Sequence, residues 1–187
     1  MLIHAGDVTE YGTEDELIDF LRWFAKQPFH YKVFIAGNND ICLEEMSAAG
    51  KKKLIPDEVI YLQNSSAEIE GMKIYGSPVT PYFLGMAFNK KNDEIHKVWN
   101  KIPDDTDILI THGPPENMLD NGLGCESLLK KVTAVKPKLH CFGHIHEQNG
   151  IQIYNSTTFV NAALVNALSP MNLPEYKIVA KPIRLRL

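Results

Sequence analysis

Five side chains of metal-binding type occur in four short polar segments, and each segment directly follows an apolar run. They are one carboxylate, one amide and three imidazoles: Asp7, Asn38, His112, His144 and His146. Mixed oxygen and nitrogen ligands suit the borderline divalent ions Mn, Fe and Zn, whereas calcium prefers oxygen ligands alone. The residue types therefore predict a transition-metal site, provided that the fold brings the segments together.

The runs that precede these side chains have the composition of buried strands. They cover residues 2–4, 31–36, 107–110 and 138–142, and each ends in a polar loop. In α/β sheets the loops beyond the carboxyl ends of strands come together in space, so ligands that are distant in sequence meet there. We therefore expect Asp7, Asn38, His112 and His144 to share one coordination sphere.

Helical periodicity and turn residues indicate the rest of the fold. Thr13 and Glu16 form a capping-box pattern ahead of apolar residues at helical spacing, which predicts a helix over 13–26. Further helices are expected over 42–53, 90–101 and 124–135. Short β-type runs at 59–62, 67–70 and 73–76 predict an antiparallel meander. An irregular loop is expected over 77–89. Further β segments are expected over 151–154, 157–162, 176–180 and 183–187. The pattern predicts an α/β fold with a mixed sheet system, in a single domain of residues 1–187.

Composition excludes several classes of protein. The chain has 187 residues, with 19 lysines and arginines against 23 aspartates and glutamates, so its net charge is −4. A protein that wraps a nucleic acid duplex carries a basic surface, and we expect no such partner. No apolar stretch approaches the roughly 18 residues of a membrane span, and no secretory signal is visible. Cys42, Cys125 and Cys141 lack CxxC spacing, which favours a reducing compartment. We expect a cytoplasmic protein that does not contact membranes.

Four motifs, in this order, give the chain a resemblance to a known family. They are Gly6-Asp7, Gly37-Asn38, Thr111-His112-Gly113-Pro114-Pro115 and Gly143-His144-Ile145-His146. The chain resembles the calcineurin-like metallophosphoesterases over nearly its whole length, and among them the small metallophosphoesterase-domain proteins. The resemblance implies two packed mixed β-sheets flanked by helices, a dinuclear metal centre, and hydrolysis of phosphomonoesters or phosphodiesters. A nucleotide is one candidate substrate.

The resemblance also implies a role for each of these side chains. Asp7 would bridge two metal ions, Asn38, His112 and His144 would complete the second metal site, and His146 would bind the first ion. Asn38, Asn39 and His112 would contact the substrate, and Asn39 stands at the position of the family's catalytic histidine. A metal-activated water would be the nucleophile.

The chain departs from the family pattern in two places. The family's Asp-x-His motif lies on a strand before Gly-Asp, and nothing between Met1 and Asp7 matches it. We therefore expect the usual first strand to be lacking, and one metal ion (Mn, Fe or Zn) rather than two. The family's Gly-Asn-His reads Gly-Asn-Asn here, and the amide of Asn39 cannot deliver a proton near neutral pH. These departures predict a metal-dependent phosphoesterase of reduced activity.

Two alternatives stay open. One is a degenerate member that binds a nucleotide or a metal without turnover. The other is a longer protein in which Met1 is an internal residue, and the in-frame DNA upstream would discriminate between them.

Other side chains have both a structural and a functional interpretation. Tyr82, Phe83 and Phe88, in the irregular loop, either form a substrate wall or pin the loop to the core. We expect His4 and His140, on strand-like runs, to be structural. A first strand without its neighbour would leave an edge free to pair with another chain, so the sequence predicts a homodimer formed through this edge or through residues 176–187.

Overall fold

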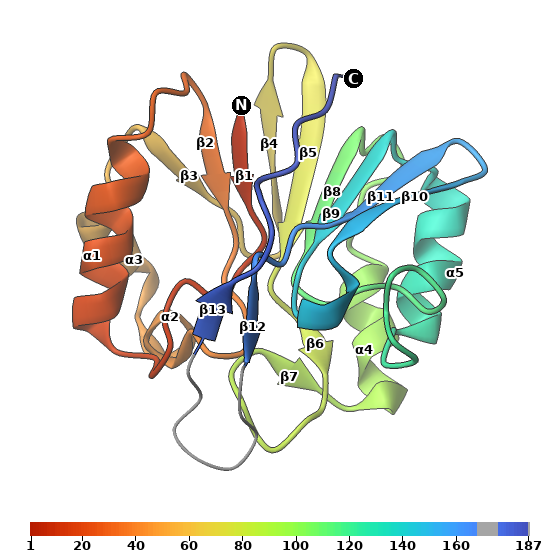
Figure 1. Ribbon diagram of the computed structural model, residues 1–187, viewed down its shortest axis with the longest axis horizontal. Coiled ribbons are helices and arrows are strands. Elements are labelled where there is room, and N and C mark those ends of the chain that lie inside the picture. Colours follow the sequence, from red (N-terminus) through yellow and green to blue (C-terminus); the bar gives the residue numbers. More distant parts are fainter. Residues whose placement is uncertain (168–175, 187) are drawn as a thin grey trace.

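The computed structural model describes residues 1–167 and 176–186, and two β-sheets form its centre (Figure 1). The smaller sheet has parallel strands in the order β1-β2-β3, namely β1 (Leu2–His4), β2 (Lys32–Phe34) and β3 (Val59–Tyr61). The larger sheet has the order β10-β11-β9-β8-β5-β4, with β4 (Ser65–Ile69), β5 (Met72–Ser77), β8 (Ile108–Thr111), β9 (Leu139–Phe142), β10 (Gly150–Tyr154) and β11 (Thr157–Asn161). Its inner strands are parallel, and β4 and β10 run antiparallel at its edges.

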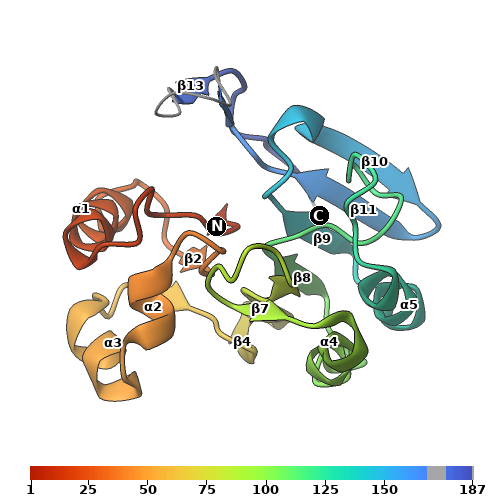
Figure 2. The same ribbon diagram turned by 90° about the horizontal axis from the view of Figure 1, so that it is seen from below.

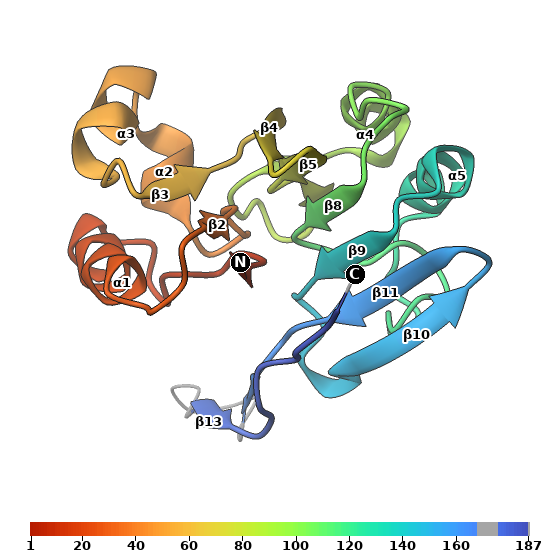
Figure 3. The ribbon, with the colours of Figure 1, turned by 90° about the horizontal axis from the view of Figure 1, so that it is seen from above.

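Helices cover the outer face of each sheet, as Figures 2 and 3 show from the two ends. The helices α1 (Glu14–Ala25), α2 (Ile41–Glu45) and α3 (Ala48–Leu54) lie beside the smaller sheet. The helices α4 (Asn92–Trp99) and α5 (Glu126–Val135) lie beside the larger one. Short elements complete the described chain: β6 (Thr80–Pro81) pairs with β7 (Asn89–Lys90), β12 (Val165–Ala167) pairs with β13 (Tyr176–Ile178), and η1 (His146–Gln148) is a 3-10 turn. The predicted fold class, two packed sheets flanked by helices, is confirmed.

The side chains of a buried strand alternate between the core between the two sheets and a core under the helices that cover its own sheet. This explains why the strand sequences are continuous apolar runs. In β8, Ile108 and Ile110 join the core between the two sheets, while Leu109 joins the core under α4 and α5. In and just after β2, Ile35 faces the core between the sheets and Phe34 packs under α1. Successive strand side chains point to opposite faces, so a strand that is buried on both faces needs no polar alternation. The sheets therefore form a rigid support for the loops at their ends.

The predicted helices are present, with one difference. Thr13 caps α1 and Glu16 returns the bond to the Thr13 backbone, as the capping-box pattern predicts. The single helix expected over 42–53 is instead two helices, because Met46 is extended and Ser47 starts a new one. The Ser47 hydroxyl accepts a hydrogen bond from the Gly50 amide at 3.1 Å, which is an N-cap within the predicted helix.

The predicted antiparallel meander is wrong for its first strand. Residues 59–61 form β3, which pairs parallel with β2 in the smaller sheet, so only β4 and β5 form a hairpin. Val59 packs among the buried residues under α1, and this burial places β3 in the smaller sheet rather than beside the hairpin. The strand expected over 183–187 is also absent from residues 183–186, which are irregular, and Leu187 lies outside the described residues. Ile183 and Leu185 nevertheless pack against the core between the sheets.

His140 has the structural role expected of it. It is fully buried in β9, where Nε2 lies 2.8 Å from the Thr111 hydroxyl, and burial lowers its pKa to about 3. The three cysteines are free, and Cys125 and Cys141 are buried. Among the described residues, no helix is long and apolar enough to cross a membrane.

The open edge of β1 generates a prediction about assembly. Within residues 1–167 and 176–186, β1 pairs with β2 alone and lies at the end of its sheet. Because an open edge presents unpaired backbone groups, we propose that two copies associate through it or by exchange of residues 176–187. Light scattering at micromolar concentrations should give the mass of a dimer. A mass of one chain across this range would contradict the proposal.

Candidate metal centre

The strands that precede the predicted ligands end at the same end of the two sheets, the end seen in Figure 2. Asp7 follows β1, Asn38 follows β2, His112 follows β8 and His144 follows β9. His112 Nε2 lies 2.9 Å from Asn38 Oδ1 and 3.3 Å from Asp7 Oδ2. One ligand atom from each of Asp7, His112 and His144 lies within 4.8 Å of the others. The structure therefore brings together the four side chains expected in one coordination sphere.

The hydrogen bonds of His112 show that this set fits a divalent cation. Its Nδ1 lies 2.8 Å from the carbonyl oxygen of Ala5, which can only accept, so Nδ1 carries the proton. In the neutral ring Nε2 is then a lone pair that faces two oxygen atoms, from Asp7 and Asn38. Ligand bonds of about 2.1 Å place neighbouring ligand atoms roughly 3.0–3.4 Å apart, which matches these separations. A cation between the three atoms would satisfy all of them.

The charge of Asp7 suits a metal ligand. Burial acts to raise its pKa, but the neighbouring His112 and the backbone N–H of Asn39 lower it to about 2. That N–H donates to Asp7 Oδ1 at 2.9 Å and so orients the carboxylate. For His112, burial acts to lower the pKa, yet the Asp7 carboxylate outweighs burial and the net shift is upward. Without a cation, the pair is thus held by mutual attraction in a buried site.

The two remaining predicted ligands differ in their placement. Burial, together with His112, lowers the pKa of His144 to about 4, so its ring is neutral at pH 7 and has a lone pair to offer. Its ring centroid lies 5.0 Å from that of His112. His146 begins η1, and in the described part of the chain it is not among the three side chains whose ligand atoms cluster. Binding of a first metal ion by His146 stays a prediction.

Backbone geometry explains why glycines precede the ligands. A Cβ at Gly37 would lie 2.3 Å from Asp7 Oδ1 and 2.5 Å from His112 Cε1. A Cβ at Gly6, where φ is +96°, would lie 2.6 Å from His112 Nδ1. Both contacts are too short for a real side chain, so glycine is required for the ligands to approach each other.

Asp40 supports the ligand loops, and the sequence did not predict this role. It is fully buried and accepts four hydrogen bonds, from the backbone of Val8, Thr9 and Gly37 and from the Thr9 hydroxyl, at 2.6–3.2 Å. It therefore ties the loop after β1 to the loop after β2. Burial and the nearby charge of Asp7 raise its pKa to about 6, although these hydrogen bonds oppose the shift. The sequence signal was the position of Asp40, three residues after Gly37 in a loop, because aspartate side chains in turns hydrogen-bond to nearby backbone groups.

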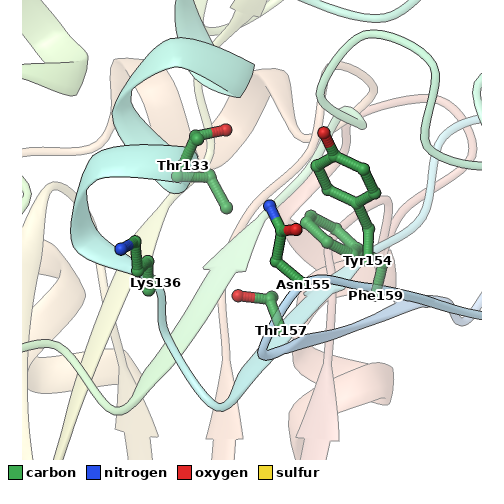
Figure 4. Close-up of a pocket in the computed structure, with 7 residues that line it drawn as sticks. Thr133, Lys136, Tyr154, Asn155, Thr157 and Phe159 are labelled. Carbon is green, nitrogen blue, oxygen red and sulfur yellow. The ribbon is translucent and has the colours of Figure 1, made fainter.

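Two hollows elsewhere on the surface do not include these ligands. Figure 4 shows one of about 10 Å³ between the end of α5 and the β10–β11 turn, lined by Lys136, Tyr154 and Asn155 among others. It holds no more than about one water molecule. A second, of about 320 Å³, lies at the starts of α4 and α5. The ligand cluster is the candidate site for chemistry because of its grouped donor atoms.

Comparison with known proteins agrees with this geometry. The sequence model of the family described as calcineurin-like phosphoesterase matches residues 1–148. The chain belongs to this family. It is 38% identical over 204 residues to human Metallophosphoesterase domain-containing protein 1, an alignment that covers 93% of this chain and 63% of that protein. A UPF0046 protein of Caenorhabditis elegans is 35% identical over 182 residues, covering 89% of this chain and 63% of its own length.

A solved structure shares the fold. The protein TT1561 of Thermus thermophilus superposes with a TM-score of 0.60 at 13% identity, covering 87% of this chain and 75% of that one. The chain spans 63% of the length of the two relatives named above. Membership of the family implies divalent metal binding, and the cluster of Asp7, His112 and His144 is a possible site for it.

The glycine contacts generate a prediction about metal binding. Mn²⁺ should raise the melting temperature of the unsubstituted protein, and Gly37→Ala should abolish this rise because the new Cβ displaces Asp7 or His112. Thermal unfolding with Mn²⁺ and with EDTA would measure this. Gly143→Ala is the matched control, since a Cβ there meets nothing closer than 3.8 Å. An equal response of both variants to Mn²⁺ would contradict the prediction.

Proposed function

We propose that this chain is a metal-dependent phosphoesterase that hydrolyses a phosphomonoester or phosphodiester through metal-activated water, with reduced activity. The supporting observation is that His112 Nε2 faces the oxygens of Asp7 and Asn38 beside His144. One Mn, Fe or Zn ion fits these four ligands. A bound ion would supply positive charge to the phosphate oxygens and lower the pKa of water.

The chain's own residues account for the reduced activity. Asn39 adjoins the ligands, since its backbone N–H donates to Asp7 and its Oδ1 accepts from the Asn38 amide at 3.2 Å. Its side chain can hydrogen-bond a phosphate oxygen but has no proton to give a leaving group. The leaving group must then take its proton from water, which slows the reaction.

The loop between β6 and β7 supports a substrate with an aromatic group. Phe88 is only 5% exposed and packs under α1, so it pins the loop. Tyr82 and Phe83 are 62% and 58% exposed, and their faces are open. The Ala87 amide donates to the Asn38 carbonyl at 3.1 Å, which attaches this loop beside a metal ligand. Stacking on open aromatic faces favours a ring-bearing ester, and a nucleotide is the example we propose.

The second candidate function is binding of a nucleotide or metal without turnover. The amide at position 39 is the observation that favours it. Both proposals concern this domain, which spans 63% of the related human protein. We further propose a cytoplasmic location, because the three cysteines are free thiols.

Activated esters test the enzymatic proposal. The purified protein should hydrolyse p-nitrophenyl phosphate or bis-p-nitrophenyl phosphate slowly in Mn²⁺ and not in EDTA, as followed by absorbance of nitrophenolate. Asp7→Asn should remove this activity because the ligand charge is lost, while Asp57→Asn, at an exposed site, should not. Mn²⁺ binding with no turnover of either ester would instead favour the second candidate.

A gain of function tests the role of position 39. Asn39→His restores a group that can donate a proton near neutral pH, and general acid catalysis contributes roughly 10²–10⁴-fold. The turnover number should rise by a factor that approaches this range, measured at saturating Mn²⁺ because Asn39 Oδ1 also contacts the ligand Asn38. An unchanged turnover number with metal bound would show that position 39 does not limit the rate.

A further inference from the structure

The side chain of Asn38 is held on its far side by a methionine from another part of the chain. Asn38 is buried, and its Oδ1 lies 2.9 Å from His112 Nε2. Its Nδ2 donates to Met86 Sδ at 3.2 Å and to the neighbouring Asn39 Oδ1 at 3.2 Å. Met86 lies in the loop between β6 and β7, 48 residues along the chain. The contact therefore links this loop to the candidate metal centre.

The chemistry of an amide makes this contact selective. The two ends of the Asn38 side chain are nearly equal in size, but only the oxygen can bind a cation. A thioether sulfur has no hydrogen and can only accept, so it pairs with the NH₂ end. If the amide turned over, its oxygen would face the sulfur of Met86 and its NH₂ would face the cation. Met86 thus disfavours the orientation in which Asn38 cannot be a ligand.

The segment that carries Met86 is itself fixed in place. The Ala87 amide donates to the Asn38 carbonyl at 3.1 Å, so both the backbone and the side chain of Asn38 contact this segment. The Phe88 amide donates to Glu44 Oε1 at 2.8 Å, which anchors the segment to α2. The Met86 amide also donates to the Phe83 carbonyl at 3.2 Å, so the sulfur is presented to Asn38 at a set position.

We propose that Met86 is a positioning residue for the metal: its sulfur orients the Asn38 amide so that Oδ1 faces the centre. The proposal rests on the metal site of the proposed function. Removing groups that orient metal ligands costs roughly 10–100-fold in metal affinity, and a sulfur acceptor belongs at the lower end of that range.

The test is a double-mutant cycle on the dissociation constant of Mn²⁺, measured by isothermal titration calorimetry. Met86→Leu keeps the size of the side chain and removes the acceptor, and it should weaken Mn²⁺ binding about 10-fold. Met86→Gln supplies an oxygen acceptor of similar reach and should restore most of the affinity. Met72→Leu, in β5, is the matched control and should change nothing.

A second background separates orientation from structure. Asn38→Asp offers oxygen at both ends of the side chain, so Met86→Leu in that background should not weaken Mn²⁺ binding further. Equal losses in both backgrounds would overturn the proposal, because a merely structural role would act in each. An unchanged Mn²⁺ affinity in Met86→Leu would overturn it too, while leaving the metal site intact. Absence of Mn²⁺ binding by the unsubstituted protein would overturn the metal site itself and this proposal with it.

Discussion

The buried imidazole of His112 joins the two sheets, and the geometry of the centre depends on it. Its Nδ1–H donates to Ala5, which follows a strand of the smaller sheet, while His112 itself follows β8 of the larger one. This bond fixes both the tautomer and the direction of Nε2. The loops that follow β1 and β2 in the smaller sheet must then pass within contact distance of the His112 ring. This explains why Gly6 and Gly37 have no room for a side chain.

Two carboxylates in the same small volume are given different tasks by their surroundings. Asp7 faces an imidazole and is kept ionised, with its pKa lowered to about 2. Asp40 faces backbone amides and a hydroxyl, and burial together with the charge of Asp7 raises its pKa to about 6. Two like charges this close are costly in a buried site unless each has its own partners. The hydrogen bonds to Asp40 hold the loops together, and the charge of Asp7 is left for a cation.

Much of this arrangement could be predicted from the sequence, because the signals were local. The capping box of Thr13 and Glu16 defines α1, and four apolar runs that end in ligand-type residues place those residues at the carboxyl ends of strands in the two sheets. The pairing of β3 with β2 could not be predicted, since it depends on which side of the fold buries Val59. Asp40 and Met86 were missed for the same reason. The position of Asp40 three residues after Gly37 indicates only their local bond, whereas Thr9 lies 31 residues from Asp40 and Asn38 lies 48 residues from Met86.

At Asn39 the backbone makes hydrogen bonds that support the ligand loops, while the side chain determines which proton chemistry is available. The backbone N–H of Asn39 orients Asp7, and its carbonyl accepts from the Thr9 hydroxyl at 3.2 Å and from the Ile41 amide at 2.9 Å. None of these three bonds uses the side chain. A histidine at this position would keep these three backbone bonds, and it would replace the contact of Asn39 Oδ1 with the Asn38 amide at 3.2 Å. What changes is the proton that the side chain can supply. The backbone of residue 39 thus supports the ligand loops independently of the proton chemistry of its side chain.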